Sequence, residues 1–410
     1  MLRTLMTRGV VTRSVGIQGC YSVVYLSLVL FLLASFRPAF GQTESVFYSF
    51  AGNGAANPEY DLAIDGQSNL YGTTFDNYGG IVYKLTPSGG FTALHAFPSG
   101  TYDGFLLTAG VILDSQGNLY GTTAEGGTEA GGTIFKISPN GTETILYNFT
   151  CQNDGCFPNA GVVMDGEGNL YGTTLGGSLY YGNVYKFVPS TGAITSLYNF
   201  TGGNDGGLPF GVVLDGEGNL YGVTQFGGSA EQGVVFKVTP SGTETVLHTF
   251  EPNGKDGFAP AATVILDSKG NLYGTTHLGG TVGVGTVYKI TPAGKETILH
   301  SFKGGADGIF PESDLMFDAK GNLYGTTYYG GQYDYGTVFE IAKAKETTLH
   351  SFDPNDGDGV LPLGGVVFDK NGNLFGPTSS GGATSEVCPE GCGTIFKITF
   401  AEDASNPLPQ

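Results

Sequence analysis

The stretch "GNLYGTT" at residues 117–123 recurs six more times in near copies, which begin at Ser68, Gly168, Gly218, Gly270, Gly321 and Gly372. Its asparagine recurs at intervals of 49 to 52 residues. A repeat of this length is typical of a propeller blade built from four strands. The composition agrees, because 70 glycines and 12% aromatic residues, with only 13% charged residues, predict short strands and turns rather than helices.

One repeat unit divides into four predicted strands, named a to d here. They are "GVVLD" (211–215), "NLYGVT" (219–224), "VVFKVT" (234–239) and "ETVLHTF" (244–250). The turn "DGEGN" between strands a and b explains its fixed aspartate. The carboxylate can accept backbone N–H groups of the turn, while glycine takes a positive φ.

The count of strands predicts a closed ring. Strands a, b and c occur seven times, but strand d follows only the first six sets, because the seventh ends at "GTIFKITF" (393–400). The missing strand is "ESVFYSF" (44–50), which matches "ETILYNF" (143–149) and precedes the first strand a. Pairing of this N-terminal strand d with the C-terminal strands a to c removes the exposed edges. We predict an all-β, seven-bladed β-propeller over residues 42–400, followed by a disordered tail at 401–410.

Four recurring segments carry a family resemblance: "GNLYGTT", the Gly-Gly pair after it, "GTVYKITP" and "ETILHSF". Their order resembles the Gloeo/Verruco (GloVer) tandem-repeat family of exported bacterial proteins over residues 44–400. The resemblance implies an exported repeat protein. The family has no agreed activity or agreed catalytic residues, so no residue roles are carried over from it. The hairpin "DxxGNLY" is also similar to NHL and gluconolactonase-like propellers, but it covers one hairpin per blade and implies only the fold.

The first 41 residues have the features of an export signal. Arg3, Arg8 and Arg13 precede an apolar run at 23–36, and small residues follow at the expected cleavage site. A retained membrane anchor is the alternative, but a spanning helix needs about 20 apolar residues and this run is shorter. We expect a secreted, periplasmic or cell-surface protein without membrane insertion after cleavage. Its net charge of −19 argues against nucleic-acid partners.

The mature chain would keep four cysteines in two close pairs. Cys151 with Cys156, and Cys388 with Cys392, are predicted to form local disulfides in an oxidising compartment. Four thiolates around zinc are the rival interpretation. The long separation between the two pairs and the compartment favour disulfides.

Variation among the copies indicates which face carries function. The loops from d to a and from b to c share one face, and the b-to-c segment varies from six residues to 15 whereas the a-to-b turn is constant. Aromatic residues in b-to-c loops offer apolar area with hydrogen-bonding tips, suited to a sugar or a protein partner. Scattered packing aromatics remain the alternative, and the absence of tryptophan weakens the carbohydrate version. The predicted ligand-binding residues are Tyr180, Tyr181, Phe226, Tyr328, Tyr329, Tyr333 and Tyr335.

An Asp-Gly pair recurs in the d-to-a loops, with Ala55-Ala56 in its place in the first unit. Six carboxylates near the propeller axis could bind calcium or a cationic ligand, or supply a general acid and base. Ordinary turn chemistry is the favoured interpretation, because catalysis needs one distinct environment and a repeated motif supplies none. The candidate metal ligands are Asp103, Asp154, Asp205, Asp256, Asp307 and Asp358.

Other chemical signals are weak. Strand d has one position shared by histidine and tyrosine, which predicts packing: Tyr48, His95, Tyr147, Tyr198, His248, His300 and His350. His277 stands alone in a b-to-c loop without a fixed partner, and no nucleophile elbow or zinc-protease motif occurs. We therefore predict a monomeric binding module for a carbohydrate or protein rather than an enzyme. The alternative is an extracytoplasmic propeller enzyme, a polysaccharide lyase or lactone hydrolase, that uses axial carboxylates and a metal.

Overall fold

The computed structural model describes residues 41–52, 55–75, 79–98, 102–177, 179 and 181–401. The predicted export signal, except for Gly41, and the predicted disordered tail beyond 401 lie outside the described residues. Within the described part, no helix is long and apolar enough to span a membrane. The only helical element there is the three-residue 3-10 turn η1 (Gly305–Asp307).

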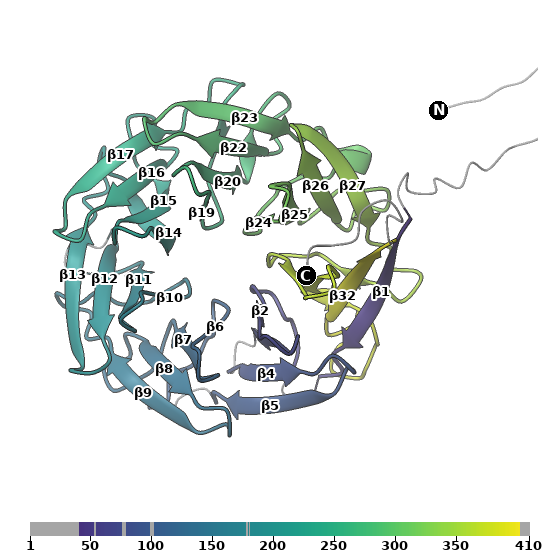
Figure 1. Cartoon of the computed structure of the whole chain (residues 1–410), viewed down its shortest axis with the longest axis horizontal. Helices are drawn as coiled ribbons and strands as arrows, with labels where there is room; N and C mark the ends of the chain where they lie inside the picture. Colours follow the sequence, from purple (N-terminus) through teal and green to yellow (C-terminus); the bar gives the residue numbers. More distant parts are fainter. Residues whose placement is uncertain are drawn as a thin grey trace, which may run out of the picture. The chain divides into compact units, whose positions relative to one another are not determined.

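Seven four-stranded antiparallel sheets surround a common axis in the order a, b, c, d from the inside outward (Figure 1). Strand a comprises β2 (Ala63–Ile64), β6 (Ile112–Leu113), β10 (Val163–Met164), β14 (Gly207–Leu214), β19 (Ile265–Leu266), β24 (Met316–Phe317) and β29 (Val367–Phe368). Strand b comprises β3 (Leu70–Thr73), β7 (Leu119–Thr123), β11 (Leu170–Thr174), β15 (Leu220–Phe226), β20 (Leu272–Thr276), β25 (Leu323–Thr327) and β30 (Leu374–Thr378). Strand c comprises β4 (Ile81–Leu85), β8 (Thr133–Ile137), β12 (Asn183–Val188), β16 (Val234–Val238), β22 (Thr286–Ile290), β26 (Thr337–Ala342) and β32 (Thr394–Phe400). Strand d comprises β5 (Phe91–Ala96), β9 (Glu143–Asn148), β13 (Ala193–Asn199), β17 (Glu244–Thr249), β23 (Glu296–Ser301), β27 (Lys345–Ser351) and β1 (Gln42–Ser49).

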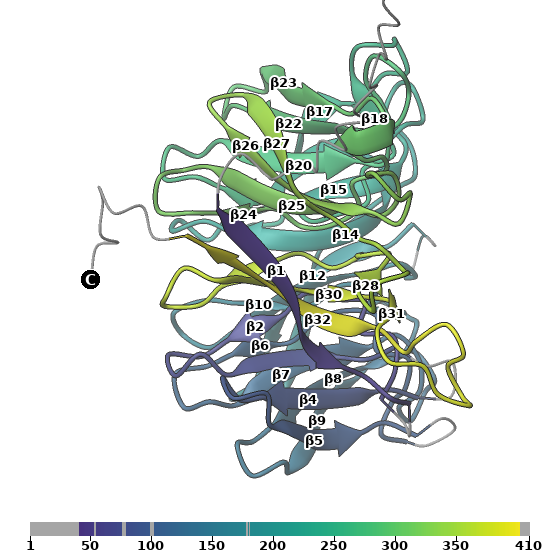
Figure 2. The same ribbon diagram turned by 90° about the vertical axis from the view of Figure 1, so that its right-hand side faces the viewer.

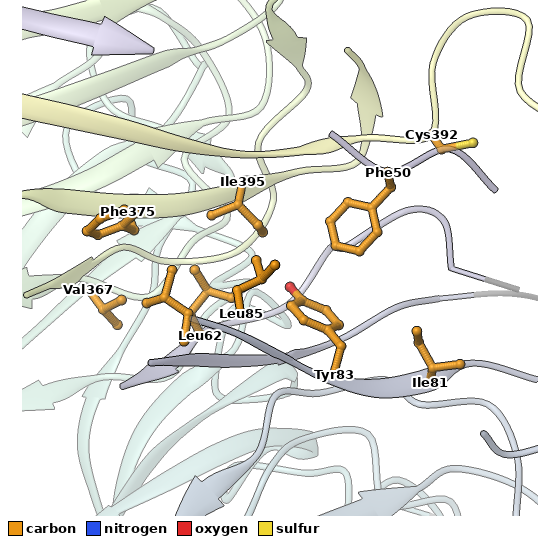
Figure 3. Packing of buried hydrophobic residues seen from close by; sticks show 10 residues of the cluster. Phe50, Leu62, Ile81, Tyr83, Leu85, Val367, Phe375, Cys392 and Ile395 are labelled. Atoms are coloured by element: carbon orange, nitrogen blue, oxygen red, sulfur yellow. The ribbon is translucent and has the colours of Figure 1, made fainter. Parts of the chain in front are cut away.

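The two ends of the propeller close the ring, as the strand count predicts. β1 pairs antiparallel with β32, from Gln42 opposite Phe400 to Ser49 opposite Thr394. Figure 2 shows β1 lying along β32 at the edge of the last blade. Figure 3 shows the core behind this junction, where Phe50 packs with side chains of the first and last blades. The prediction of a seven-bladed propeller sealed by its N-terminal strand is confirmed.

The turn between strands a and b has the hydrogen bonds that its fixed aspartate predicts. In the second blade, Oδ1 of Asp114 accepts the backbone N–H groups of Gln116 and Asn118 at 2.9 and 2.8 Å. Its Oδ2 accepts from Asn118 Nδ2 at 2.7 Å and from the hydroxyl of Tyr120 at 3.1 Å. Gly117 has φ +80°, a conformation that glycine adopts without strain. The repeated phrase therefore locks the hairpin that opens each blade.

The d-to-a and b-to-c loops pair with one another on one face of the ring. Residue pairs Phe105 with Glu125 and Ile309 with Tyr329 form isolated bridges between these loops. Two longer pairings join β18 (Gly257–Phe258) to β21 (Leu278–Gly279) and β28 (Gly359–Val360) to β31 (Ser380–Gly381). The two sets of variable loops are therefore held together by backbone pairing.

Candidate functional site

A cavity of about 410 Å³ lies at the axis, and residues at the starts of all seven strands a line it. Figure 1 shows the inner strands surrounding this centre. Ligand pockets commonly measure about 300–1,000 Å³, so the axial cavity has room for a small ligand. The residues that the chain places on its wall therefore decide what the cavity can hold.

One position on the wall differs sharply between the blades. The residue four places before the turn aspartate is Gly110, Gly161, Gly211, Thr263 or Gly365 in five blades, but Asp61 and Asp314 in the other two. The glycines leave room in a crowded ring, because a Cβ at Gly365 would lie 2.9 Å from Asp61 Oδ1 and 3.0 Å from the carbonyl oxygen of Asp314. The Asp61 carboxylate and the backbone and Cβ of Asp314 therefore lie on either side of the space that a Gly365 side chain would fill. The two aspartates give the ring the distinct environment that the repeated motifs do not supply.

Asp61 and Asp314 form a carboxyl pair held by backbone donors of other blades. Asp61 Oδ1 accepts the N–H of Gly365 at 2.5 Å, and Asp314 Oδ1 accepts the N–H of Thr263 at 2.6 Å. Burial, together with the charge and hydrogen bond of Asp61, raises the pKa of Asp314 well above its usual range. Two like charges in such contact are unfavourable, which favours the protonated form of Asp314. The cavity wall thus holds two carboxyl groups in contact, of which Asp314 is the deeply buried one.

Further acidic and aromatic side chains surround the axial pair. Glu59 and Glu312 line the same cavity, and burial raises the pKa of Glu59 to about 7. His277 Nδ1 lies 2.5 Å from Glu312 Oε1, and its ring stacks on Phe310 with centroids 4.4 Å apart. His277 therefore has a carboxylate partner that the sequence did not reveal.

Tyr328 connects the variable loops to this acidic group. Burial, then Tyr329, and then the charges of Glu312 and Glu59 raise its pKa to about 12. The rings of Tyr328 and Tyr329 meet edge to face with centroids 4.4 Å apart. Among the predicted aromatic residues, Tyr328 is therefore the one whose surroundings include the acids of the axial cavity.

The remaining predicted aromatic residues lie in the third and fourth blades and in the sixth. Tyr181 covers Gly202, whose Cβ would meet the tyrosine ring at 2.4 Å, and contacts Phe226 edge to face at 5.8 Å. Tyr333 and Tyr335 follow Tyr329 in the sixth blade, and all three are about 40% exposed. Tyr180 lies outside the described residues. The aromatic residues thus form two groups rather than one surface.

The six Asp-Gly aspartates point to the outer strands and not to the axis, which corrects the predicted position. Each accepts or shares a hydrogen bond with the histidine or tyrosine of strand d in its own blade, the outermost strand in Figure 1. The pairs are His95–Asp103 (3.1 Å), Tyr147–Asp154 (3.0 Å), Tyr198–Asp205 (2.9 Å), His248–Asp256 (3.2 Å), His300–Asp307 (2.9 Å) and His350–Asp358 (2.6 Å). Five of the aspartates also accept a backbone N–H of their own loop, for example Asp154 from Thr150 at 2.7 Å. Loop capping therefore draws these carboxylates away from the centre.

Four of these aspartates belong to groups that could hold a metal ion. In each group a histidine and its aspartate are joined by a glutamate from strand d of the next blade, and their ligand atoms lie within 4.8 Å of one another. The groups are His95–Asp103–Glu143, His248–Asp256–Glu296, His300–Asp307–Glu346 and His350–Asp358–Glu44.

One of the two predicted disulfides is present. Cys388 and Cys392 are bonded, as predicted. Cys151 and Cys156 are separate thiols, which corrects the second prediction. Cys156 is buried and forms a bridge to Gly176, while the neighbouring Cys151 is exposed and has φ +59°. Burial, then the neighbouring Cys151, raises the pKa of the Cys156 thiol to about 12.

Sequence reasoning missed the axial residues Glu59, Asp61, Glu312 and Asp314. The available signal was their departure from the repeat, because glycine stands at the place of Asp61 and Asp314 in most copies.

Seven antiparallel blades around an axial cavity define a seven-bladed β-propeller. The chain belongs to the Gloeobacter/Verrucomicrobia repeat family, whose model matches residues 32–215 and 208–408. The predicted family resemblance is confirmed.

Solved propellers share the fold at low sequence identity. A streptogramin B lyase is 15% identical with a TM-score of 0.59, over 88% of this chain and 98% of that one. Virginiamycin B lyase from Staphylococcus aureus is 14% identical with a TM-score of 0.56, over 88% of this chain and 100% of that one. A protein from Lactobacillus plantarum is 17% identical with a TM-score of 0.51, over 77% of this chain and 88% of that one. At these identities the likeness shows the fold alone. A search of curated proteins gave no match.

Proposed function

We propose that the protein is an exported, monomeric binding protein that takes a carbohydrate at the axial cavity. The observation that carries the proposal is the pair Asp61 and Asp314, which stands where four other blades have glycine. Carboxylates accept hydrogen bonds from sugar hydroxyl or ammonium groups, and such charge-assisted bonds are stronger than neutral ones. The ligand is therefore a small polyhydroxylated molecule, with an amino group favoured by the acidic surroundings.

The neighbours of the pair support this ligand class. Glu59 and Glu312 add hydrogen-bond acceptors to the cavity wall, and Tyr60 adds an aromatic face with a hydroxyl group. The cavity volume of about 410 Å³ suits one or two sugar rings. Export is supported by the Cys388–Cys392 disulfide and by the predicted signal, because disulfides persist in oxidising compartments.

A glycan array followed by calorimetry tests the proposal. Asp61→Gly and Asp314→Gly restore the residue of the other blades, so the backbone accepts both substitutions. Each variant should bind the identified sugar about tenfold more weakly or worse, as expected when a buried carboxyl group that hydrogen-bonds the ligand is removed. Tyr181→Ser, in the separate aromatic group, should bind as the wild type does. Binding that depends on Tyr181 and not on the aspartates would place the ligand on the loop surface instead, and no binding to any glycan would refute the ligand class.

A second candidate function is catalysis at the same cavity by a lyase or lactone hydrolase. It is favoured by one observation: Glu59, with a pKa of about 7, and Asp314, whose pKa is raised well above its usual range, line one cavity. A base that titrates near neutral pH beside a proton donor is the arrangement that acid–base catalysis requires. The propeller fold is shared with a streptogramin B lyase, which supports this candidate through the fold only. Consumption of a bound sugar by the wild type, lost in Glu59→Gln with binding retained, would establish it.

A further inference from the structure

Four of the seven joints between neighbouring blades contain the same three side chains. A histidine of strand d and an aspartate of the following loop come from one blade, and a glutamate of strand d comes from the next. The pairs of outer strands that meet there are β5 with β9, β17 with β23, β23 with β27 and β27 with β1, which lie side by side along the rim in Figure 1. The groups therefore lie outside the axial cavity and are independent of the proposed carbohydrate site.

In the group of His248, Asp256 and Glu296, two buried carboxyl groups lie close together and require a cation or a proton between them. His248 Nε2 lies 3.2 Å from Asp256 Oδ2 and 3.6 Å from Glu296 Oε1. The Asp256 side chain is only 6% exposed, and its Oδ1 is a buried atom without a hydrogen-bond partner among the described residues. Glu296 Oε1 is in the same situation. Buried carboxylate oxygens without partners are unfavourable, so either a proton shared between Asp256 and Glu296 or a bound cation is expected here.

Two of the other three groups repeat the buried glutamate oxygen, whereas Glu346 Oε1 in the third accepts a hydrogen bond from Thr348 Oγ1 at 3.1 Å. Oε1 of Glu44 and Oε1 of Glu143 are likewise buried without a hydrogen-bond partner among the described residues. The group of His300, Asp307 and Glu346 lines a surface depression of about 550 Å³, which gives ions in solution a path to it. The sites are thus enclosed but reachable.

The spacing and the chemistry of the donors select the kind of ion. Nitrogen and oxygen ligands that bind a tetrahedral metal at about 2.1 Å lie about 3.4 Å from one another. The distances of 3.2 and 3.6 Å around His248 are close to this value. Calcium prefers oxygen ligands only, whereas one imidazole and two carboxylates suit zinc and its neighbours in the first transition row. We propose that the four His–Asp–Glu groups bind divalent transition-metal ions of the zinc class, each with a fourth position left for water.

The remaining three joints supply the internal comparison. Tyr147 occupies the histidine position in one joint, and Ile194 stands opposite it where the metal groups have glutamate. Tyr198 occupies it in another, with Glu244 opposite. Tyr48 stacks on Phe91 with centroids 5.2 Å apart and an interplanar angle of 9°. At this position of strand d, histidine therefore occurs only where the aspartate and the glutamate are also present. Tyrosine occupies the same position in the other blades, which shows that the fold accepts it.

The test counts bound metal in the tag-free mature protein. Protein stripped with a chelator is dialysed against zinc at neutral pH, and the retained metal is measured by mass spectrometry. The wild type should retain one zinc more than His248→Tyr and one more than Glu296→Ile, both of which copy residues of other joints. Tyr198→Phe, at a joint without histidine, should retain as much as the wild type. Cobalt should give the absorption spectrum of a tetrahedral site, weakened by about a quarter in His248→Tyr.

Two outcomes would overturn the proposal. The first is equal zinc retention by the wild type and His248→Tyr, with circular dichroism showing both variants folded. The second is no retained zinc and no tetrahedral cobalt spectrum in the wild type, in which case protons alone satisfy the buried carboxylates.

Discussion

Substitution of Phe50 by alanine tests the closure of the ring. Phe50 follows β1 and is 1% exposed, and its ring contacts Tyr48, Tyr83 and Phe91 with centroids 5.0 to 6.0 Å away. Removal of a buried phenylalanine costs about 3–5 kcal/mol, because apolar transfer is lost and a cavity remains. The matched control is Phe302→Ala at the same place in another blade, where the ring is 0% exposed. If β1 is bound in solution, the two substitutions should destabilise the protein equally.

Urea unfolding followed by circular dichroism and tyrosine fluorescence provides the assay, since the chain has no tryptophan. For a propeller of this size the slope is at least about 3 kcal/mol per M, so each variant should lower the midpoint by about 1 M. A shift for Phe302→Ala without one for Phe50→Ala would show that Phe50 is not buried in solution. The ring would then be open, and the arrangement of loops around one axial mouth would fail with it.

Three further predictions follow from the packing and the charges. Burial and then Asp256 raise the pKa of Glu296 from 4.5 to about 8, so the metal-free folded state binds the Glu296 proton more tightly than the unfolded state does. The free energy of unfolding should therefore fall as pH rises from 4.5 to 8. Glu296→Gln should reduce that fall in urea titrations across this pH range. Asp165→Ala removes an acceptor of four hydrogen bonds and should cost about 2–4 kcal/mol in the same assay, whereas Asp165→Asn should cost less because both backbone bonds can remain. Gly121→Ala would place a Cβ 2.5 Å from Phe135 Cζ and should lower the melting temperature by an amount equivalent to about 1–3 kcal/mol; no change in melting would contradict the tight packing there.

The fold could be predicted from the sequence because its determinants are local and repeated. The interval between copies of the phrase predicted a four-stranded blade. The match of residues 44–50 to strand d predicted that the N-terminal strand pairs with the last blade and closes the ring. The turn aspartate could be interpreted from its fixed distance to the asparagine, since both partners lie within six residues.

The site could not be predicted in the same way, because it consists of departures from the repeat that meet only through the closed ring. Asp61 and Asp314 are far apart in the chain. Their contact depends on the ring bringing together the positions four residues before each turn aspartate, where other blades have glycine. The direction of the Asp-Gly carboxylates was also undetermined. A spacing of seven or eight residues between the strand d residue and the aspartate was visible, but that spacing does not show whether the loop folds inward or outward.

β1 contacts chemically different side chains on its two neighbouring blades, so conditions that weaken one contact need not weaken the other. On one side Glu44 joins the polar group of His350 and Asp358, while on the other Tyr48 stacks on Phe91 beside Ala55, which replaces the usual Asp-Gly. Stacked aromatic rings respond to neither acidity nor chelators. A change in pH or the addition of a chelator should therefore weaken the contact between the N-terminal strand and the sixth blade. The stacking of the same strand on the first blade should not change, so only one of its two sides depends on solution conditions.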